Sequence, residues 1–239
     1  MNLLFNAFLA LGVACVTSLA HSQSATPAAA PAQQQAVAPA AAGGVSIESK
    51  VAMCMGCHNI RGYQASFPEV HKVPMIAGQS AKYIAAALTA YKNGDRKHPT
   101  MRGIAASLTE QDVATIASYY ESLPKEEVKP LAEKQSREPN AQVAGLLQKA
   151  ACVSCHGANF SKPIDPSYPK IAGQHADYLF VALKAYKTEN NPAVGRSNGV
   201  MGAIAKQFSN AELKALASYV GSLDSELRVH PEPRFHRGR

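Results

Sequence analysis

The chain has 239 residues, of which 46% are hydrophobic and 17% are charged, and it contains no tryptophan. This composition allows one or two domains with an aliphatic core. It excludes collagen, a disulfide-dense miniprotein and a polytopic membrane protein. The formal net charge of +7 is by itself compatible with nucleic-acid binding. The five cysteines form an odd number, and their positions carry most of the functional information.

The N-terminal region has the pattern of a targeting segment. Residues 3–20 are almost continuously apolar, and Ala20 and Ser22 provide small residues where a signal peptidase cleaves. We therefore expect residues 1–22 to be a signal peptide that directs the chain to the periplasm. Cleavage there removes Cys15 and leaves four cysteines in the mature protein. The alternative is an uncleaved leader, which would associate the protein with a membrane.

The rest of the chain contains two copies of one unit, and such a repeat determines the architecture. The segments IAGQSAKYIAAALTAY and IAGQHADYLFVALKAY are identical at ten of sixteen positions. The matching pairs of segments are 54–58 with 152–156, 76–91 with 171–186, and 101–123 with 201–223. The predicted organisation is an Ala/Pro/Gln-rich disordered tether at 23–45, domains at 46–124 and 141–224, a solvated linker at 125–140, and a basic tail at 225–239.

Both units are predicted to be helical, and no strand is expected. In the first unit, helices are expected at 46–57 and at 81–93, the second capped by Ser80 and ended by Gly94. In the second unit, one helix is expected to run from Asn140 through Cys155. The last helix of each unit begins with a capping-box pattern, at Thr109/Asp112 and Ser209/Glu212. The loops at 93–108 and 187–208 are long enough to carry function.

The chemistry is predicted by a C-x-x-C-H motif in each unit. This motif is the attachment signature of c-type haem, because its spacing brings two thiols and an imidazole to one side of a helix. A zinc ribbon needs closer CxxC pairs, a thioredoxin-like site needs a βαβ unit, and disulfides between such neighbours would constrain little. The predicted thioether residues are Cys54, Cys57, Cys152 and Cys155, and the predicted proximal iron ligands are His58 and His156.

The sixth ligand of each iron is expected to be methionine, which is common in haem electron carriers. Met101 and Met201 are the methionines that occupy equivalent positions of the two units. His98 remains an alternative for the first haem because it lies three residues from Met101. The other candidates fail the test of equivalence or lie on the proximal helix, namely Met53, Met55, Met75, His71 and His175.

Other residues are expected to support the haems. A proximal histidine needs an acceptor at Nδ1, and the carbonyls of Pro74 and Pro169, which both precede the repeated IAGQ, are the candidates. Without haem, a cleft is expected between His58 and Met101, and another between His156 and Met201. Four tyrosines at helical spacing are expected to pack against the porphyrins, namely Tyr83, Tyr91, Tyr178 and Tyr186.

This doubled arrangement of CxxCH, PxIAGQ, Y-x4-L-x2-Y, Met and ASYxxSL resembles the dihaem cytochrome c4 family over residues 46–224. The resemblance implies an all-α fold of two tandem cytochrome c domains in a pseudo-twofold arrangement, each with one covalent haem c. It implies haem propionates near the interface. It further implies periplasmic electron transfer from a donor such as a quinol-oxidising complex to a terminal oxidase or reductase.

Two other functions stay open. The chain could be the cytochrome subunit of a complex such as flavocytochrome c sulfide dehydrogenase, or a dihaem thiosulfate dehydrogenase or peroxidase. We expect an electron-transfer protein rather than an enzyme, because both irons would be six-coordinate. Nucleic acid is not an expected partner. An acidic redox protein is expected at the first methionine loop, whose basic residues are Lys92, Arg96, Lys97 and Arg102.

Overall fold

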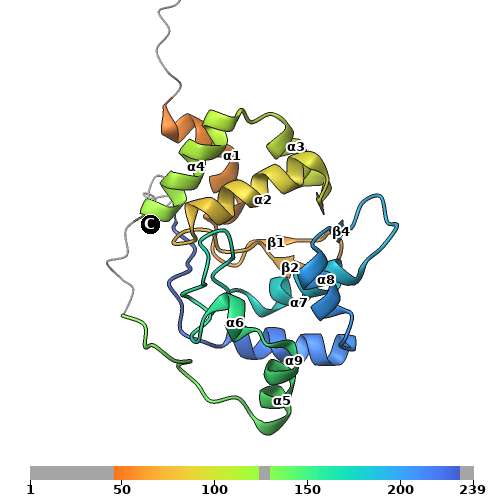
Figure 1. Ribbon diagram of the computed structural model, residues 1–239. Coiled ribbons are helices and arrows are strands. Elements are labelled where there is room, and N and C mark those ends of the chain that lie inside the picture. The colour runs from red at the N-terminus through yellow and green to blue at the C-terminus, as the bar shows by residue number, and fades with distance from the viewer. Residues whose placement is uncertain (1–45, 124–129, 232–239) are drawn as a thin grey trace, which may run out of the picture. The chain divides into compact units, whose positions relative to one another are not determined.

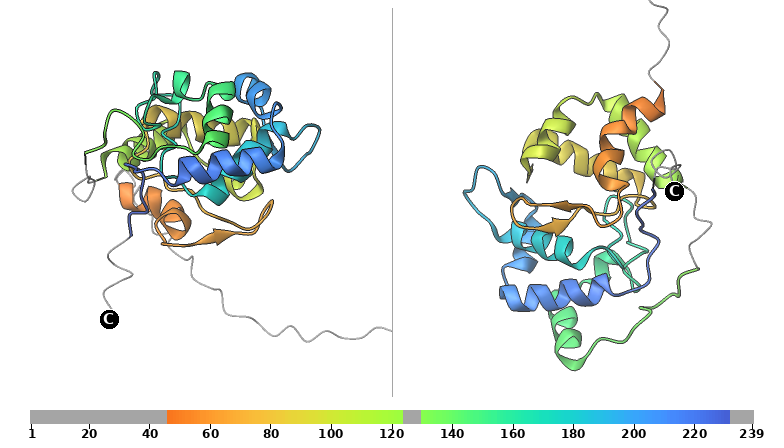
Figure 2. Two further views of the ribbon diagram at one scale, coloured as in Figure 1. Left: turned by 90° about the horizontal axis from the view of Figure 1, so that it is seen from below. Right: turned by 180° about the vertical axis from the view of Figure 1, so that it is seen from behind.

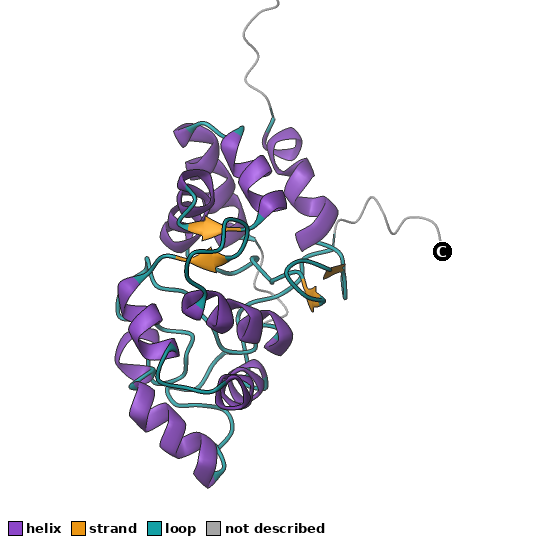
Figure 3. Cartoon of the chain, turned by 90° about the vertical axis from the view of Figure 1, so that its right-hand side faces the viewer, coloured by secondary structure: helices purple, strands orange, loops and turns teal. Residues whose placement is uncertain are grey.

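The computed structural model describes residues 46–123 and 130–231. Helices make up most of both domains, and the strands are short (Figures 1 and 3). The predicted signal peptide at 1–22 and tether at 23–45 lie outside the described residues, as do 124–129 of the linker region and 232–239 of the tail. Within the described ranges, no helix is both long and apolar enough to cross a membrane.

The first domain is built from helices around an aliphatic core. Its helices are α1 (Ile47–His58), α2 (Ala81–Asn93), α3 (Pro99–Ala106) and α4 (Glu110–Ser122). Both α1 and α2 pack against α4. Val51, Ile116 and Tyr120 are almost fully buried where these helices meet. Thr109 and Asp112 form the expected capping box at the start of α4.

The second domain repeats this arrangement around its own core. Its helices are α5 (Ala141–Ala150), α6 (Val153–His156), α7 (Ala176–Lys187), α8 (Gly199–Ala205) and α9 (Asn210–Gly221). Both α5 and α7 pack on α9. Phe160 and Leu213 are buried there, and full burial of a side chain of this size contributes about 1.5–3 kcal/mol. Ser209 and Glu212 form the expected capping box of α9.

Three local expectations were wrong. The helix predicted from Asn140 through Cys155 is interrupted at Ala151, whose left-handed conformation (φ 48°) ends α5. A left-handed alanine leaves no signal in the sequence, because glycine is the usual residue at such an end. The Ser80 side chain does not cap α2, and its hydroxyl instead donates to Pro166 O of the other domain at 2.6 Å. The two predicted loops contain α3 and α8.

The strands were also not expected. They form two antiparallel pairs, β1 (Gln64–Ala65) with β2 (His71–Lys72), and β3 (Arg96–Lys97) with β4 (Gly195–Arg196). The second pair joins the two domains, so its hydrogen bonds depend on tertiary structure rather than on a local period. The β1–β2 hairpin of the first domain lies beside α7 of the second (Figure 2).

Two ion pairs and a hydrogen bond fix this hairpin to α7. The Lys72 backbone N–H donates to Asp177 Oδ2 at 3.0 Å, and the Lys72 ammonium lies 3.6 Å from the same oxygen. Lys184 of α7 forms an ion pair with Glu69 at 2.6 Å. The hairpin therefore belongs to the interface between the domains as well as to the first domain.

The C-terminal segment returns from the second domain to the first. After α9 the chain runs back toward α4 (Figure 1). The Arg228 N–H donates to Ala77 O at 3.2 Å, and the Arg228 guanidinium donates to Leu123 O at 2.6 Å. Leu227 is buried. The described part of the predicted tail, 225–231, thus acts as a strap between the domains.

Candidate haem sites

The first CxxCH motif lies at the end of α1 and opens onto a cavity. Cys54, Cys57 and His58 line this cavity, which has a volume of about 640 Å³ and extends into both domains. The His58 Nδ1 atom lies 2.8 Å from Pro74 O. A carbonyl oxygen can only accept, so Nδ1 carries the proton and the Nε2 lone pair is free. This is the tautomer that a histidine needs to ligate iron.

Burial keeps His58 and Cys54 uncharged. It lowers the pKa of His58, although the hydrogen bond to Pro74 partly opposes this shift. Burial also raises the pKa of the Cys54 thiol to about 11, so its sulfur is protonated near neutral pH. A neutral imidazole and two cysteine sulfurs beside a largely apolar cavity fit a covalently attached haem.

The second CxxCH motif repeats this geometry despite the interruption at Ala151. Cys152, Cys155 and His156 line the same cavity. The backbone N–H of His156 donates to Cys152 O at 3.0 Å, and this bond keeps the motif helical. The side-chain Nδ1 of His156 lies 3.0 Å from Pro169 O. Burial lowers the pKa of His156 as it does that of His58.

The two methionines lie on short helices that border the same cavity as the motifs. Met101 is on α3 and Met201 is on α8, and both line the cavity. His98 caps α3 by accepting from the Met101 N–H at 3.4 Å. Asn198 caps α8 by accepting from the Met201 N–H at 2.9 Å. Two separate clefts were expected, one in each domain. Instead, the lining residues of both domains belong to one continuous cavity.

Of the competing ligands, Met55 and His175 do not line the cavity, whereas the others do, namely Met53, Met75, His71 and His98. Met55 is only 4% exposed and belongs to the core of the first domain, whereas Met53 is 52% exposed. The backbone of Met75 is hydrogen bonded to the other domain. His71 is a buried residue of the hairpin strand β2, with Nδ1 at 2.8 Å from Glu69 O. His175 is at the start of α7.

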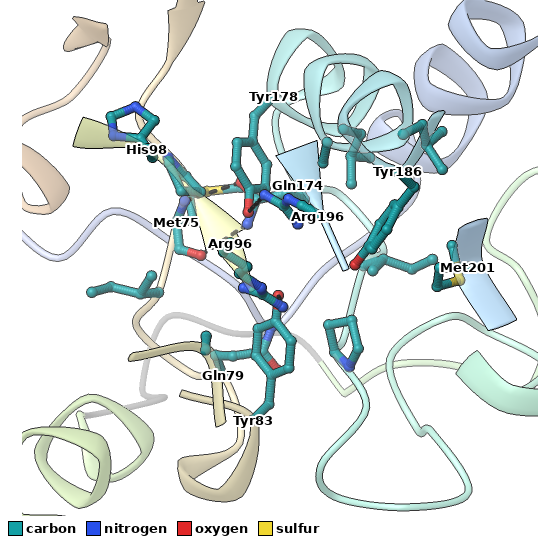
Figure 4. Close-up of a pocket in the computed structure, with 18 of the residues that line it drawn as sticks. Met75, Gln79, Tyr83, Arg96, His98, Gln174, Tyr178, Tyr186, Arg196 and Met201 are labelled. Atoms are coloured by element: carbon teal, nitrogen blue, oxygen red, sulfur yellow. Dashed lines mark hydrogen bonds between the residues drawn. The ribbon is translucent and has the colours of Figure 1, made fainter. Parts of the chain in front are cut away.

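Two arginines and four tyrosines line the cavity at its junction, where the part within the first domain meets the part within the second. All of them except Tyr91 are labelled in Figure 4. Arg96 donates to the Tyr83 hydroxyl at 3.2 Å, and its guanidinium lies 5.2 Å from the Tyr83 ring centroid and 5.8 Å from that of Tyr91. Arg196 donates to the Tyr178 hydroxyl at 3.0 Å and stacks in the same manner on the rings of Tyr178 and Tyr186. Burial raises the pKa of Tyr83 to about 12, so its hydroxyl keeps its proton.

These contacts correct the expected docking face. Arg96 is stacked inside the cavity rather than presented to a partner, and Lys97 donates to Asn191 O of the second domain at 2.7 Å. Lys92 donates to Leu108 O at 2.7 Å. Of the four basic residues, only Arg102 is exposed without such a contact among the described residues. The equivalence of Arg96 and Arg196 in the repeat was the available signal for a shared structural role.

Comparison with known proteins agrees with this geometry. The cytochrome c family model matches residues 49–124 and 141–224. The chain is 30% identical over 196 residues to cytochrome c4 of Thiocapsa roseopersicina, covering 79% of this chain and 97% of that protein. It is 29% identical over 177 residues to the thiosulfate dehydrogenase electron acceptor of Stutzerimonas stutzeri, covering 71% and 79% of the two chains.

Comparison with a solved structure also finds a cytochrome c4. Cytochrome c4 of Acidithiobacillus ferrooxidans aligns with a TM-score of 0.52 at 27% identity, covering 72% of this chain and 99% of that chain. The cytochromes c4 are electron-transfer proteins, not enzymes. With two matched domains and a CxxCH motif in each, the chain belongs to the cytochrome c family, as a dihaem cytochrome c4 with two covalently bound haem c groups.

Proposed function

We propose that this protein is a periplasmic carrier that passes single electrons between redox proteins of a respiratory chain. The observation that carries the proposal is the cavity into which both domains direct the same set of groups. The groups proposed to hold the two haems are the thioether residues Cys54, Cys57, Cys152 and Cys155, the proximal ligands His58 and His156, and the distal ligands Met101 and Met201.

The remaining lining residues have supporting roles. Bound haem supplies a one-electron iron couple whose potential depends on ligands, hydrogen bonds and burial. Arg96 and Arg196 provide positive charge for the haem carboxylates at the junction of the cavity. The carbonyls of Pro74 and Pro169 hold the proximal imidazoles in one tautomer and orientation. Apolar side chains such as Ile84 and Leu179 exclude water from the cavity walls.

The partners of this carrier are proposed by chemistry and by relationship. A quinol-oxidising complex is the proposed donor, and a terminal oxidase or reductase is the proposed acceptor. A second candidate donor is a thiosulfate dehydrogenase, because a relative at 29% identity is named as the electron acceptor of that enzyme. The proposed docking face is the rim of the first domain at α3, where Arg102 is exposed and complements an acidic partner.

The absorption spectrum of the oxidised holoprotein tests the ligation. Two methionine-ligated irons give a red charge-transfer band with the intensity expected for two haems. Met101→Ala and Met201→Ala are each expected to halve that band while both haems stay attached, because the thioethers persist. Retention of the full two-haem band in Met101→Ala would assign the first haem to another methionine. A wild-type band of one-haem intensity that Met101→Ala leaves unchanged would make His98 the ligand of the first haem.

Electron exchange with an acidic partner tests the docking face. Charge reversal in Arg102→Glu is expected to slow exchange at low salt, and this difference is expected to shrink as the Debye length falls to about 8 Å near physiological ionic strength. Lys134→Glu in the exposed linker is the control. Equal slowing by both variants, or none by Arg102→Glu, would remove the rim of the first domain as the docking face.

A further inference from the structure

Two buried glutamines at equivalent positions of the repeat cross the interface in opposite directions. Gln174 of the second domain accepts from the Met75 N–H at 3.0 Å and donates to Met75 O at 2.8 Å. Gln79 of the first domain accepts from the Lys170 N–H at 3.1 Å and donates to Lys170 O at 3.0 Å. Each side-chain amide thus binds a donor and an acceptor of the other domain's backbone, which fixes its orientation. Figure 4 labels both glutamines and Met75.

The peptide groups that they bind are the ones that hold the proximal histidines. The Met75 N–H and the Pro74 C=O belong to one peptide group, and that carbonyl accepts from His58 Nδ1 at 2.8 Å. The Lys170 N–H and the Pro169 C=O likewise belong to one peptide group, which accepts from His156 at 3.0 Å. Each proximal histidine is therefore linked through one peptide group to a glutamine of the opposite domain.

Such a link changes the strength of the bond to histidine. When a peptide N–H donates, its carbonyl becomes a better acceptor, and hydrogen-bond chains strengthen by about 10–30% per bond. A better acceptor at Nδ1 makes the imidazole a more basic ligand, which favours the oxidised iron. Gln79 and Gln174 are only 3% and 4% exposed, so water does not replace them.

We propose that Gln174 tunes the haem of the first domain and that Gln79 tunes the haem of the second. Both act as positioning residues through the peptide groups before Met75 and Lys170. The proposal rests on the proposed ligation by His58 and His156. The wild-type spectrum tests that ligation separately, so the tuning can fail while the ligation stands.

The experiment is to measure both reduction potentials by spectroelectrochemistry in Gln174→Met and Gln79→Met holoproteins. The haems are assigned from Met101→Ala and Met201→Ala, each of which alters one of them. Gln174→Met is expected to raise the potential of the first haem alone, and Gln79→Met that of the second alone. The Nδ1–H proton resonance of the proximal histidine is expected to move upfield at the same haem, as its hydrogen bond weakens.

Ser80→Ala is the matched control for a loosened interface. It removes another buried interdomain hydrogen bond, to Pro166 O, without touching either proximal peptide group. Gln174→Asn is a second variant that keeps a polar amide but is too short to reach both atoms of Met75. A shift at the haem of the mutated domain, equal shifts at both haems, or the same shifts in Ser80→Ala would each overturn the proposal.

Discussion

Arg96 and Arg196, which are equivalent in the two repeats, pair with each other in the antiparallel ladder between β3 and β4. An antiparallel pairing of equivalent residues is what a pseudo-twofold axis requires at that point. The pairing brings two positive charges to the junction of the cavity. Among residues 46–123 and 130–231, no carboxylate forms an ion pair with either arginine, and tyrosine rings surround them instead.

Removal of either arginine is expected to lower both reduction potentials. Positive charge near an iron favours its reduced form, and both guanidinium groups lie where the two parts of the cavity join. Arg96→Met and Arg196→Met are therefore expected to act on both haems and downward, in contrast to the glutamine variants. Spectroelectrochemistry measures this, with Arg137→Met as an exposed control. A shift confined to one haem would contradict a shared position.

Gly78→Ala is expected to destabilise the fold by about 2–4 kcal/mol, because the residue has a positive φ and a close backbone neighbour. Its φ is 85°, and an added Cβ would lie 2.5 Å from Glu226 O. Gly103→Ala is the control, because the added Cβ meets nothing within 4 Å in α3. Helix propensity predicts a gain of about 0.5–1 kcal/mol there. Urea unfolding of the holoproteins compares the two, and equal stability would refute the steric argument.

Loss of the strap is expected to weaken the contact between the domains. Arg228→Ala removes the guanidinium hydrogen bond to Leu123 O and should cost about 1–3 kcal/mol. Amide hydrogen exchange is expected to rise near Ala77, whose carbonyl accepts from the strap. Lys134→Ala on the exposed linker is the comparison. Unchanged exchange near Ala77 would show that the strap does not restrain the first domain.

Acid is expected to weaken the tie between α1 and α4. The hydrogen bond from Lys50, 2.5 Å from Asp112, and those from Thr109 lower the pKa of Asp112 to about 2. A depressed folded-state pKa stabilises the protein fully above the unfolded value of about 3.9, and this stabilisation is lost as the pH falls toward 2. Denaturation curves at pH 5, 3 and 2 for Asp112→Asn, compared with wild type, are expected to converge at the acid end. Parallel curves would exclude a role for Asp112.

The sequence was sufficient where a feature was local or repeated. The CxxCH motifs, the equivalent Met101 and Met201, and the capping boxes are all patterns that two copies of a unit display together. The prolines before IAGQ were proposed as acceptors for the same reason, and their carbonyls lie within hydrogen-bond distance of the histidines. Which atoms ligate iron stays a prediction.

The interface could not be predicted, because its contacts join residues far apart in the chain. Arg96 resembles a solvated loop residue until Tyr83 and Tyr91 are known to enclose it. The repeated glutamine of IAGQ signalled importance, but its partner is a backbone about 90 residues away, Lys170 for Gln79. The strap was expected to be part of a tail, because no periodicity marks its contact with Ala77.

The strap also decides whether the two halves of the molecule can be studied apart. A first domain separated at the linker loses the hydrogen bonds that Arg228 donates to Ala77 and Leu123. It also loses the Glu226 backbone, whose close approach requires glycine at position 78. A second domain cut there keeps the segment, which the Glu226–Lys170 ion pair still holds, but loses the contacts of Arg228 with the first domain. The isolated halves are therefore not smaller versions of the same protein, and their properties should not sum to those of the whole chain.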